Sequence, residues 1–328
     1  MDLQTLKDCE LFIANKKAVK KVFPWDGGLI HTCCAGIYSS KGISVDTRIL
    51  AECRSMLKSG TTVFSNFRST VSAPLISLLA TGENPSLTLN NAFQIYKALK
   101  KQLHGSVYLP LTSTVIAQSA NSVDFDRIVS RTGHIYSLMK SKHPFLTSGE
   151  DNAMCALMAL SDKTDDILLD DMEECYRILK KQFFSSNAVQ SLSHVLALCD
   201  GAPADKCNRT VRLFKILKES GRKYGTDYEL ASLGVLAMSN ADFNEIAALM
   251  TEIDAWLSKQ KGFGVMSPVS KRQRLMYAGI LAGRKYIDET SIQITSVNST
   301  MSMIIAQQAA ICACAAAGAA SAASSGAH

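Results

Sequence analysis

The chain has 328 residues and a formal net charge of +6; 47% of its residues are hydrophobic and 20% are charged. Enough apolar side chains are present to bury a large core, which excludes a mostly disordered chain. The densest basic runs, residues 16–21 and 271–274, are short and lie far apart in the sequence. Because nucleic-acid binding needs basic residues gathered on one face, we expect no nucleic-acid partner.

The amino-terminal residues and the cysteines indicate the cellular compartment. The first residues run into a charged amphipathic segment that lacks the apolar core and cleavage site of a signal peptide. The ten cysteines form no C-x-x-C pair, whereas a structural zinc site needs four ligands at defined spacing. We therefore expect a cytoplasmic protein with reduced thiols, and we predict neither a metal nor a cofactor.

An amphipathic segment recurs along the chain with a period of about 40 residues, within the range typical of stacked helix pairs. Clear copies span residues 53–58, 95–100, 135–140, 175–180, 213–218 and 253–258, and a degenerate copy spans residues 15–20. Charged side chains stay on one side of these segments. We interpret them as the outer helices of successive pairs.

A second, more apolar segment follows each copy. The turns between the two segments carry an aromatic residue: Phe23, Phe64, Phe145, Phe184, Tyr224 and Phe263. The apolar segments end in two apolar residues and an alanine, at residues 78–80, 115–117, 157–159, 195–197, 235–237 and 280–282. At a fixed distance before that alanine stand residues whose side chains can cap a helix start, namely Ser69, Ser106, Ser148, Ser186 and Thr226. We interpret these segments as inner helices.

The repeat predicts the fold class. Residues 1–289 are expected to form an all-α domain of about seven tandem helix pairs. No segment alternates between apolar and polar residues with period two, so we expect almost no strand. Stacked pairs give either an open α-solenoid or a closed α/α toroid, and the periodicity fits both. In both arrangements the inner helices begin at one common rim.

Polar residues at the start of the inner helices are the candidate ligand-binding residues. Alignment on the shared alanine places His31, Asp151, Glu229 and Arg274 at one position and Gln190 at the next, and His194 lies further along its helix. The two histidines could act as acid or base and Arg274 as an anion clamp. The favoured alternative is structural: Asp151 and Glu229 complement the helix dipole, Arg274 is solvated or paired, and His194 is a core histidine. The spacing is not diagnostic of a metal site, and no residue can be assigned a catalytic role.

The carboxy-terminal residues 290–328 differ from the rest in composition. They contain no Lys, Arg, Asp or Glu, and alanine, serine and other small residues dominate residues 301–323. We expect a small-residue helix that docks in a groove of this chain or of a neighbour. Alanine and serine favour membrane insertion little, and Gln307 and Gln308 interrupt the stretch. The sequence therefore argues against a membrane anchor.

Several long strings resemble a known bacterial family. They cover residues 183–198, 228–237, 261–264, 271–276 and 304–308. These strings look like members of the family catalogued as domain of unknown function 4003, and the resemblance extends over almost the whole chain. It implies a bacterial, single-module protein. It implies no catalytic residues, because the family has no assigned activity.

Three functions remain open from the sequence. Helical arrays most often present binding surfaces, so we favour a non-enzymatic scaffold that binds a protein, a peptide or its own tail. The alternative is an enzyme or small-ligand binder with a polar site at the rim where the inner helices begin. Attachment to a membrane or an assembly through the tail is a third and weaker hypothesis.

Overall fold

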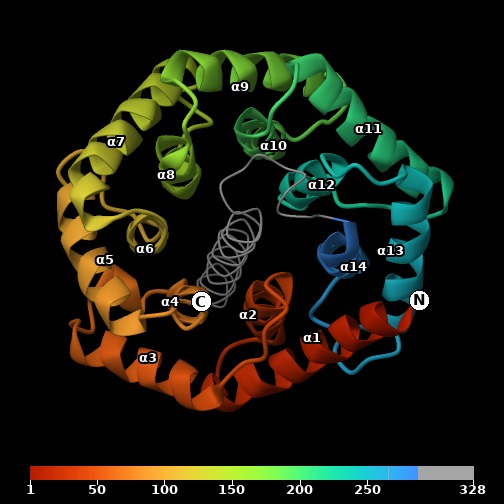
Figure 1. The fold of residues 1–328 in the computed structure, drawn as a ribbon, viewed down its shortest axis with the longest axis horizontal. Helices are drawn as coiled ribbons and strands as arrows, with labels where there is room; N and C mark the ends of the chain where they lie inside the picture. Colours follow the sequence, from red (N-terminus) through yellow and green to blue (C-terminus); the bar gives the residue numbers. More distant parts are fainter. Residues whose placement is uncertain (265, 287–328) are drawn as a thin grey trace, which may run out of the picture.

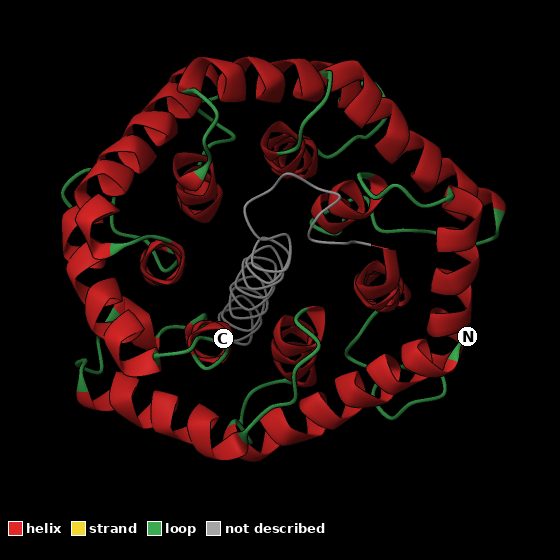
Figure 2. Cartoon of the chain, in the orientation of Figure 1, coloured by secondary structure: helices red, strands yellow, loops and turns green. Residues whose placement is uncertain are grey.

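The computed structural model describes residues 1–264 and 266–286. Within these ranges the chain forms fourteen α-helices, three short 3₁₀-helices and no strand, which confirms the all-α prediction. Figure 2 shows that the described helices are joined only by loops and turns. The small-residue tail predicted at residues 290–328, and the domain boundary placed at residue 289, lie outside the described residues.

The helices form two concentric layers (Figure 1). The outer layer consists of α1 (Leu3–Val22), α3 (Thr47–Ser59), α5 (Pro85–Leu99), α7 (Phe125–Lys142), α9 (Asp165–Leu179), α11 (Pro203–Glu219) and α13 (Phe243–Leu257). The inner layer consists of α2 (Gly28–Ser40), α4 (Ser72–Leu79), α6 (Leu109–Ser119), α8 (Asn152–Leu160), α10 (Ser186–Leu198), α12 (Leu230–Ala237) and α14 (Lys271–Tyr286). Each outer helix packs against the inner helix that follows it, so the chain alternates between the layers.

Local sequence explains the difference between the layers. Most outer helices begin with a polar cap: the side chain of Asp2 accepts a hydrogen bond from the Thr5 amide at 2.8 Å, and the side chain of Asp242 caps α13. Basic residues occupy the last turn of several of them, where they complement the helix dipole. The inner helices are instead buried along almost their whole length, so they must be covered on every side.

The last helix pair packs against the first and closes the ring. The inner helix α14 contacts both α1 and α2. The ring of Phe12 on α1 lies 5.8 Å from that of Phe263 and 5.4 Å from that of Tyr277 on α14, measured between ring centroids. Tyr277 also places its hydroxyl 3.0 Å from the Cys33 sulfur on α2. An ion pair between Asp2 and Lys285, at 2.7 Å, joins the same two ends at the surface.

Ring closure can be tested by truncating Phe12, which is 1% exposed. The Phe12→Ala variant should lose about 3–5 kcal/mol of unfolding free energy, because a large side chain between the first and last pairs leaves a cavity. Phe64→Ala is the matched control, since Phe64 is 95% exposed. It should change stability by less than about 0.5 kcal/mol. Urea unfolding measures both variants, and a small effect of equal size in the two would contradict a packed ring junction.

Candidate functional site

Three of the six candidate residues lie together between α8 and α10. Asp151 ends the 3₁₀-helix that precedes α8, and Gln190 and His194 lie on successive turns of α10. The Asp151 Oδ1 atom is 3.7 Å from His194 Nδ1, and the Gln190 amide nitrogen is 3.4 Å from the Thr147 hydroxyl. All three candidate side chains are buried. The fold therefore assembles a small polar cluster at the start of these two inner helices.

A capping box positions Asp151. The backbone amide of Ser148 donates to Asp151 Oδ2 at 2.8 Å, and the Ser148 hydroxyl in turn caps the start of the 3₁₀-helix. The sequence pattern of a serine followed three residues later by an acid predicts this arrangement, and the structure confirms it. Asp151 is thus held by its own turn, and its second oxygen is the one that faces α10.

Burial determines the charge state of this cluster. It raises the pKa of Asp151 to about 7, an effect that the hydrogen bond from the Ser148 amide partly offsets. Burial, with a smaller contribution from His143, lowers the pKa of His194 to about 3. His194 is therefore neutral at neutral pH, and its contact with Asp151 is not an ion pair. Neither ring nitrogen of His194 has a hydrogen-bond partner among the described residues.

The chemistry open to this cluster is restricted by access. A general acid or base must come within hydrogen-bonding distance of its substrate, yet the His194 side chain has no exposed surface and that of Asp151 is 9% exposed. A carboxyl with a raised pKa can mark an active site. Here desolvation inside the inner layer accounts for the shift, so the cluster fits a structural role.

The other three candidates lie elsewhere. His31 Nε2 is 2.7 Å from the carbonyl oxygen of Phe23, so the side chain fastens α2 to the turn before it. Glu229 accepts a hydrogen bond from the Asp227 amide at 3.3 Å, and burial raises its pKa. No hydrogen bond or ion pair in the described ranges joins His31, Glu229 or Arg274 to the Asp151 cluster.

Arg274 is bound by an acid within the protein. Its guanidinium donates to both carboxylate oxygens of Asp254, at 2.6 and 3.3 Å, and to the Phe263 carbonyl at 2.8 Å. Arg222 also reaches Asp254, at 3.0 Å. Removing one partner of such a buried pair strands the other charge. The anion that Arg274 binds is therefore Asp254 of α13, a residue that the sequence alignment of inner helices does not reveal.

Three grooves open on the outer wall of the ring. Their volumes are about 580 Å³ along α9, 370 Å³ along α7 and 390 Å³ along α3. Their linings include residues that the alignment of the predicted outer helices places at the same positions: Arg54, Ser55 and Lys58 on α3, Tyr136, Ser137 and Lys140 on α7, and Tyr176, Arg177 and Lys180 on α9. Grooves thus open at aligned positions of three outer helices, with a lysine common to all three and with different residues completing each lining.

Each groove borders the end of the preceding outer helix. Lys21 and Val22, at the end of α1, line the α3 groove, and Gln102 and His104, after α5, line the α7 groove. At α9 the corresponding neighbour is His143, whose Nε2 lies 3.0 Å from Glu173 and whose ring packs 5.0 Å from that of Tyr176. The grooves are therefore formed where consecutive outer helices meet.

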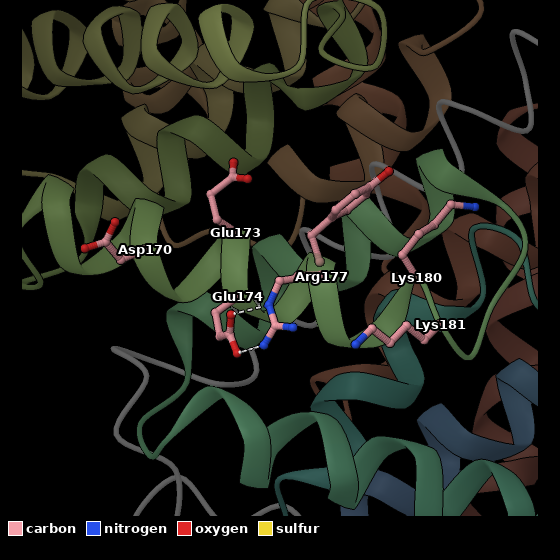
Figure 3. Close-up of a pocket in the computed structure, with 7 residues that line it drawn as sticks. Asp170, Glu173, Glu174, Arg177, Lys180 and Lys181 are labelled. Carbon is pink, nitrogen blue, oxygen red and sulfur yellow. Dashed lines mark hydrogen bonds and ion pairs between the residues drawn. The ribbon is translucent and has the colours of Figure 1, made fainter.

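The α9 groove carries both signs of charge (Figure 3). Asp170 and Glu173 lie on its amino-terminal part, and Lys180 and Lys181 lie at its carboxy-terminal end. Glu174 and Arg177 pair with each other, with Arg177 Nε 2.7 Å from the carboxylate. Lys180 also donates to the Phe184 carbonyl, which fixes the following turn. The groove is thus polarised along the helix, acidic at one end and basic at the other.

The part of the chain that the structure describes contains neither a metal-binding cluster nor a membrane-spanning helix. No group of three or more His, Cys, Asp or Glu side chains there is arranged to hold a metal ion. None of the helices there combines the length and the apolar character needed to cross a bilayer.

The buried Asp151 carboxyl predicts a specific pH dependence. Its folded pKa lies above the ordinary value of 3.8, so the folded state binds the proton more tightly and is destabilised as the pH rises from about 4 towards 7. Asp151→Asn removes this effect. As the pH rises from 5 to 8, the unfolding free energy of the variant should increase by about 2–4 kcal/mol relative to that of the wild type. Urea unfolding at the two pH values measures the difference.

The comparison between variants isolates Asp151, because the opposing contribution of His194 is present in both proteins. Asp166→Asn, at an exposed position of α9, is the control and should show no such gain. If the difference in unfolding free energy between Asp151→Asn and the wild type were the same at pH 5 and at pH 8, the raised pKa of Asp151 would be contradicted.

Comparison of the sequence with known proteins and family models identifies the family of this chain. A model of the family described as "Protein of unknown function (DUF4003)" matches residues 15–310. No curated protein matches the chain, and no solved structure does. The match covers well over half of the chain and runs from within α1 to beyond the end of α14. The chain therefore belongs to the DUF4003 family, as its resemblance to that family implied.

Proposed function

We propose that this protein is a non-enzymatic scaffold of tandem helix pairs that binds a protein or peptide on its outer wall. The observation that carries the proposal is the recurrence of one groove at equivalent positions of α3, α7 and α9. A bacterial, cytoplasmic setting, expected from the sequence, is part of the same proposal.

The size and lining of the grooves suit short peptide segments. Their volumes fall within or near the range of small-molecule and side-chain pockets. Tyr136 and Tyr176 offer half-buried aromatic surface next to charged groups, and such residues are common anchors at interfaces. In the α9 groove a partner with a basic residue near Glu173 and an acidic residue near Lys181 would match the charges. Copies of the groove on one wall allow a single partner to bind at several points, which raises its overall affinity.

The competing proposal from the sequence was a polar ligand site where the inner helices begin. The cluster of Asp151, Gln190 and His194 is the only part of that site whose members lie together among the described residues, and all three side chains are buried. Arg274 is already neutralised by Asp254. The described geometry therefore favours the scaffold over an enzyme.

The proposal is tested by site-specific photo-crosslinking in cells that express the protein. A photoreactive phenylalanine analogue replaces Ser55, Ser137 or Arg177, one in each groove. We expect all three positions to crosslink the same protein. The control places the analogue at Asp166, which is exposed at the other end of α9. Equal crosslinking at Asp166, or none above background in the grooves, would refute the proposal.

The partner identified by mass spectrometry is then purified and its affinity measured. The double substitution Tyr176→Ala and Lys181→Glu should weaken binding by about tenfold or more, since interface anchors of this kind contribute at least about 1.4 kcal/mol. An unchanged affinity would exclude the α9 groove as the site.

A further inference from the structure

Large apolar side chains project from the turns that join outer helices to inner helices. Trp25, Phe64, Phe145 and Phe184 are 94%, 95%, 99% and 96% exposed, and each belongs to a different helix pair. Aromatic residues are normally at least half buried in a folded protein. Their exposure at four equivalent places in the ring is therefore a feature to be explained.

These turns lie together on one face of the ring, which we call the basic rim. Asn66, in the turn after α3, donates to the carbonyl of Ser106, in the turn after α5, at 3.1 Å. Tyr108 in turn donates to Glu150, in the turn after α7, at 3.1 Å. Near the ring junction, Gln273 at the start of α14 donates to Tyr228. These bonds join the turns after α3, α5 and α7 to one another, and the turn after α11 to the start of α14. Since every such turn leads from an outer helix to an inner helix, the turns that carry the four aromatic residues belong to the same face.

The same rim carries a circle of exposed lysines. Every outer helix has one in or directly after its last turn: Lys20, Lys58, Lys100, Lys140, Lys180, Lys218 and Lys259. Exposed acids gather instead at the opposite rim, where outer helices begin, among them Asp46, Glu83, Asp126, Asp166, Asp205 and Asp242. Lysines therefore predominate where outer helices end and acids where they begin, with Arg48 and Arg127 as exposed basic residues at the acidic rim.

The helix dipole accounts for part of this pattern. Lysines at the carboxy-terminal end and acids at the amino-terminal end stabilise each outer helix. The dipole gives no reason for the aromatic side chains, which project into solvent beside the lysines. Exposed aromatic residues flanked by basic residues are the combination found where proteins rest on membrane surfaces, since the rings enter the headgroup region and the lysines attract anionic lipids.

The arrangement favours a bilayer over other anionic partners. The four aromatic residues stand on separate turns around a ring, so one flat surface meets all of them at once. A nucleic-acid strand would need rings placed in succession along one groove. A protein would need a contiguous patch with a buried centre. The positive charge of the rim complements a bilayer whose surface is negative, as the cytoplasmic leaflet is.

We propose that the basic rim docks on an anionic lipid bilayer, with the ring lying flat and with Trp25, Phe64, Phe145 and Phe184 inserted between the headgroups. This contact is made at the surface and needs no helix that crosses the membrane. The rim shares Lys58, Lys140 and Lys180 with the outer-wall grooves, whereas none of the four aromatic residues is among the described lining residues of those grooves. The docked ring leaves its acidic rim open to partners.

Tryptophan fluorescence provides the direct test, because the chain has two tryptophans. Trp256→Phe leaves Trp25 as the only one. The full chain is mixed with vesicles of phosphatidylcholine alone, or with vesicles of which about one third is phosphatidylglycerol. We expect at least about tenfold tighter binding to the anionic vesicles, loss of binding in about 1 M salt, and a blue shift of Trp25 emission that lipids brominated near the headgroup quench. Equal binding to both vesicles, or an unshifted emission in the bound state, would overturn the proposal.

Matched variants assign the binding to the rim. Phe145→Ser with Phe184→Ser should weaken vesicle binding by at least about tenfold, because each serine removes an inserted ring. The control is Val123→Ser with Ile167→Ser, which changes two exposed apolar residues at the opposite rim and should bind as the parent protein does. An equal loss in both pairs would contradict the rim assignment. Duplex DNA that binds the parent protein more tightly than the anionic vesicles do, and loses that affinity in the Phe145 and Phe184 variant, would assign the rim to nucleic acid instead.

Discussion

The fold depends on covering inner helices that are apolar on almost every side. An outer helix covers one side of each, and inner neighbours cover the two flanks, but the first and last inner helices of an open array would lack one flank. Ring closure supplies it. Phe12 and Phe263 pack with Tyr277, which in turn meets Cys33 across the junction. The hydrophobic effect acting on α2 and α14 therefore favours a ring over an open superhelix.

Ring closure also brings the charged residues at the ends of the outer helices together on the two rims. Acids favour the start of a helix and lysines favour its end, and every outer helix runs the same way around the ring. Seven repetitions place the starts on one rim and the ends on the other. Basic residues that look scattered in the sequence, such as Lys20, Lys100 and Lys218, consequently share one face. The short basic runs in the sequence do not reveal this gathering, because whole helix pairs separate one run from the next.

The sequence predicts what depends on neighbours along the chain. The all-helical content and the capping box of Ser148 and Asp151 follow from periodicity and from a short motif. Contacts between helices that lie far apart in the sequence do not follow from such local patterns. Arg274 and Asp254 are twenty residues apart on different helices, and no local pattern indicates the pair. Even at aligned positions the outcome differs: Ser148 caps the 3₁₀-helix before α8, whereas α12 begins at Leu230 after Glu229 and has no side-chain cap.

The sequence also does not predict which aromatic residues of the turns are buried and which are exposed. Phe23, Tyr224 and Phe263 are 3%, 4% and 0% exposed, so they contribute to the core. Phe64, Phe145 and Phe184 hold comparable places in the repeat yet project into solvent, and in the first pair Trp25 projects while Phe23 packs. An aromatic residue of the turn is therefore part of the core in one helix pair and exposed to solvent in another. In a ring built from structurally similar pairs, packing explains what the copies share, and the exposed aromatic residues that packing does not explain are the ones that we assign to binding.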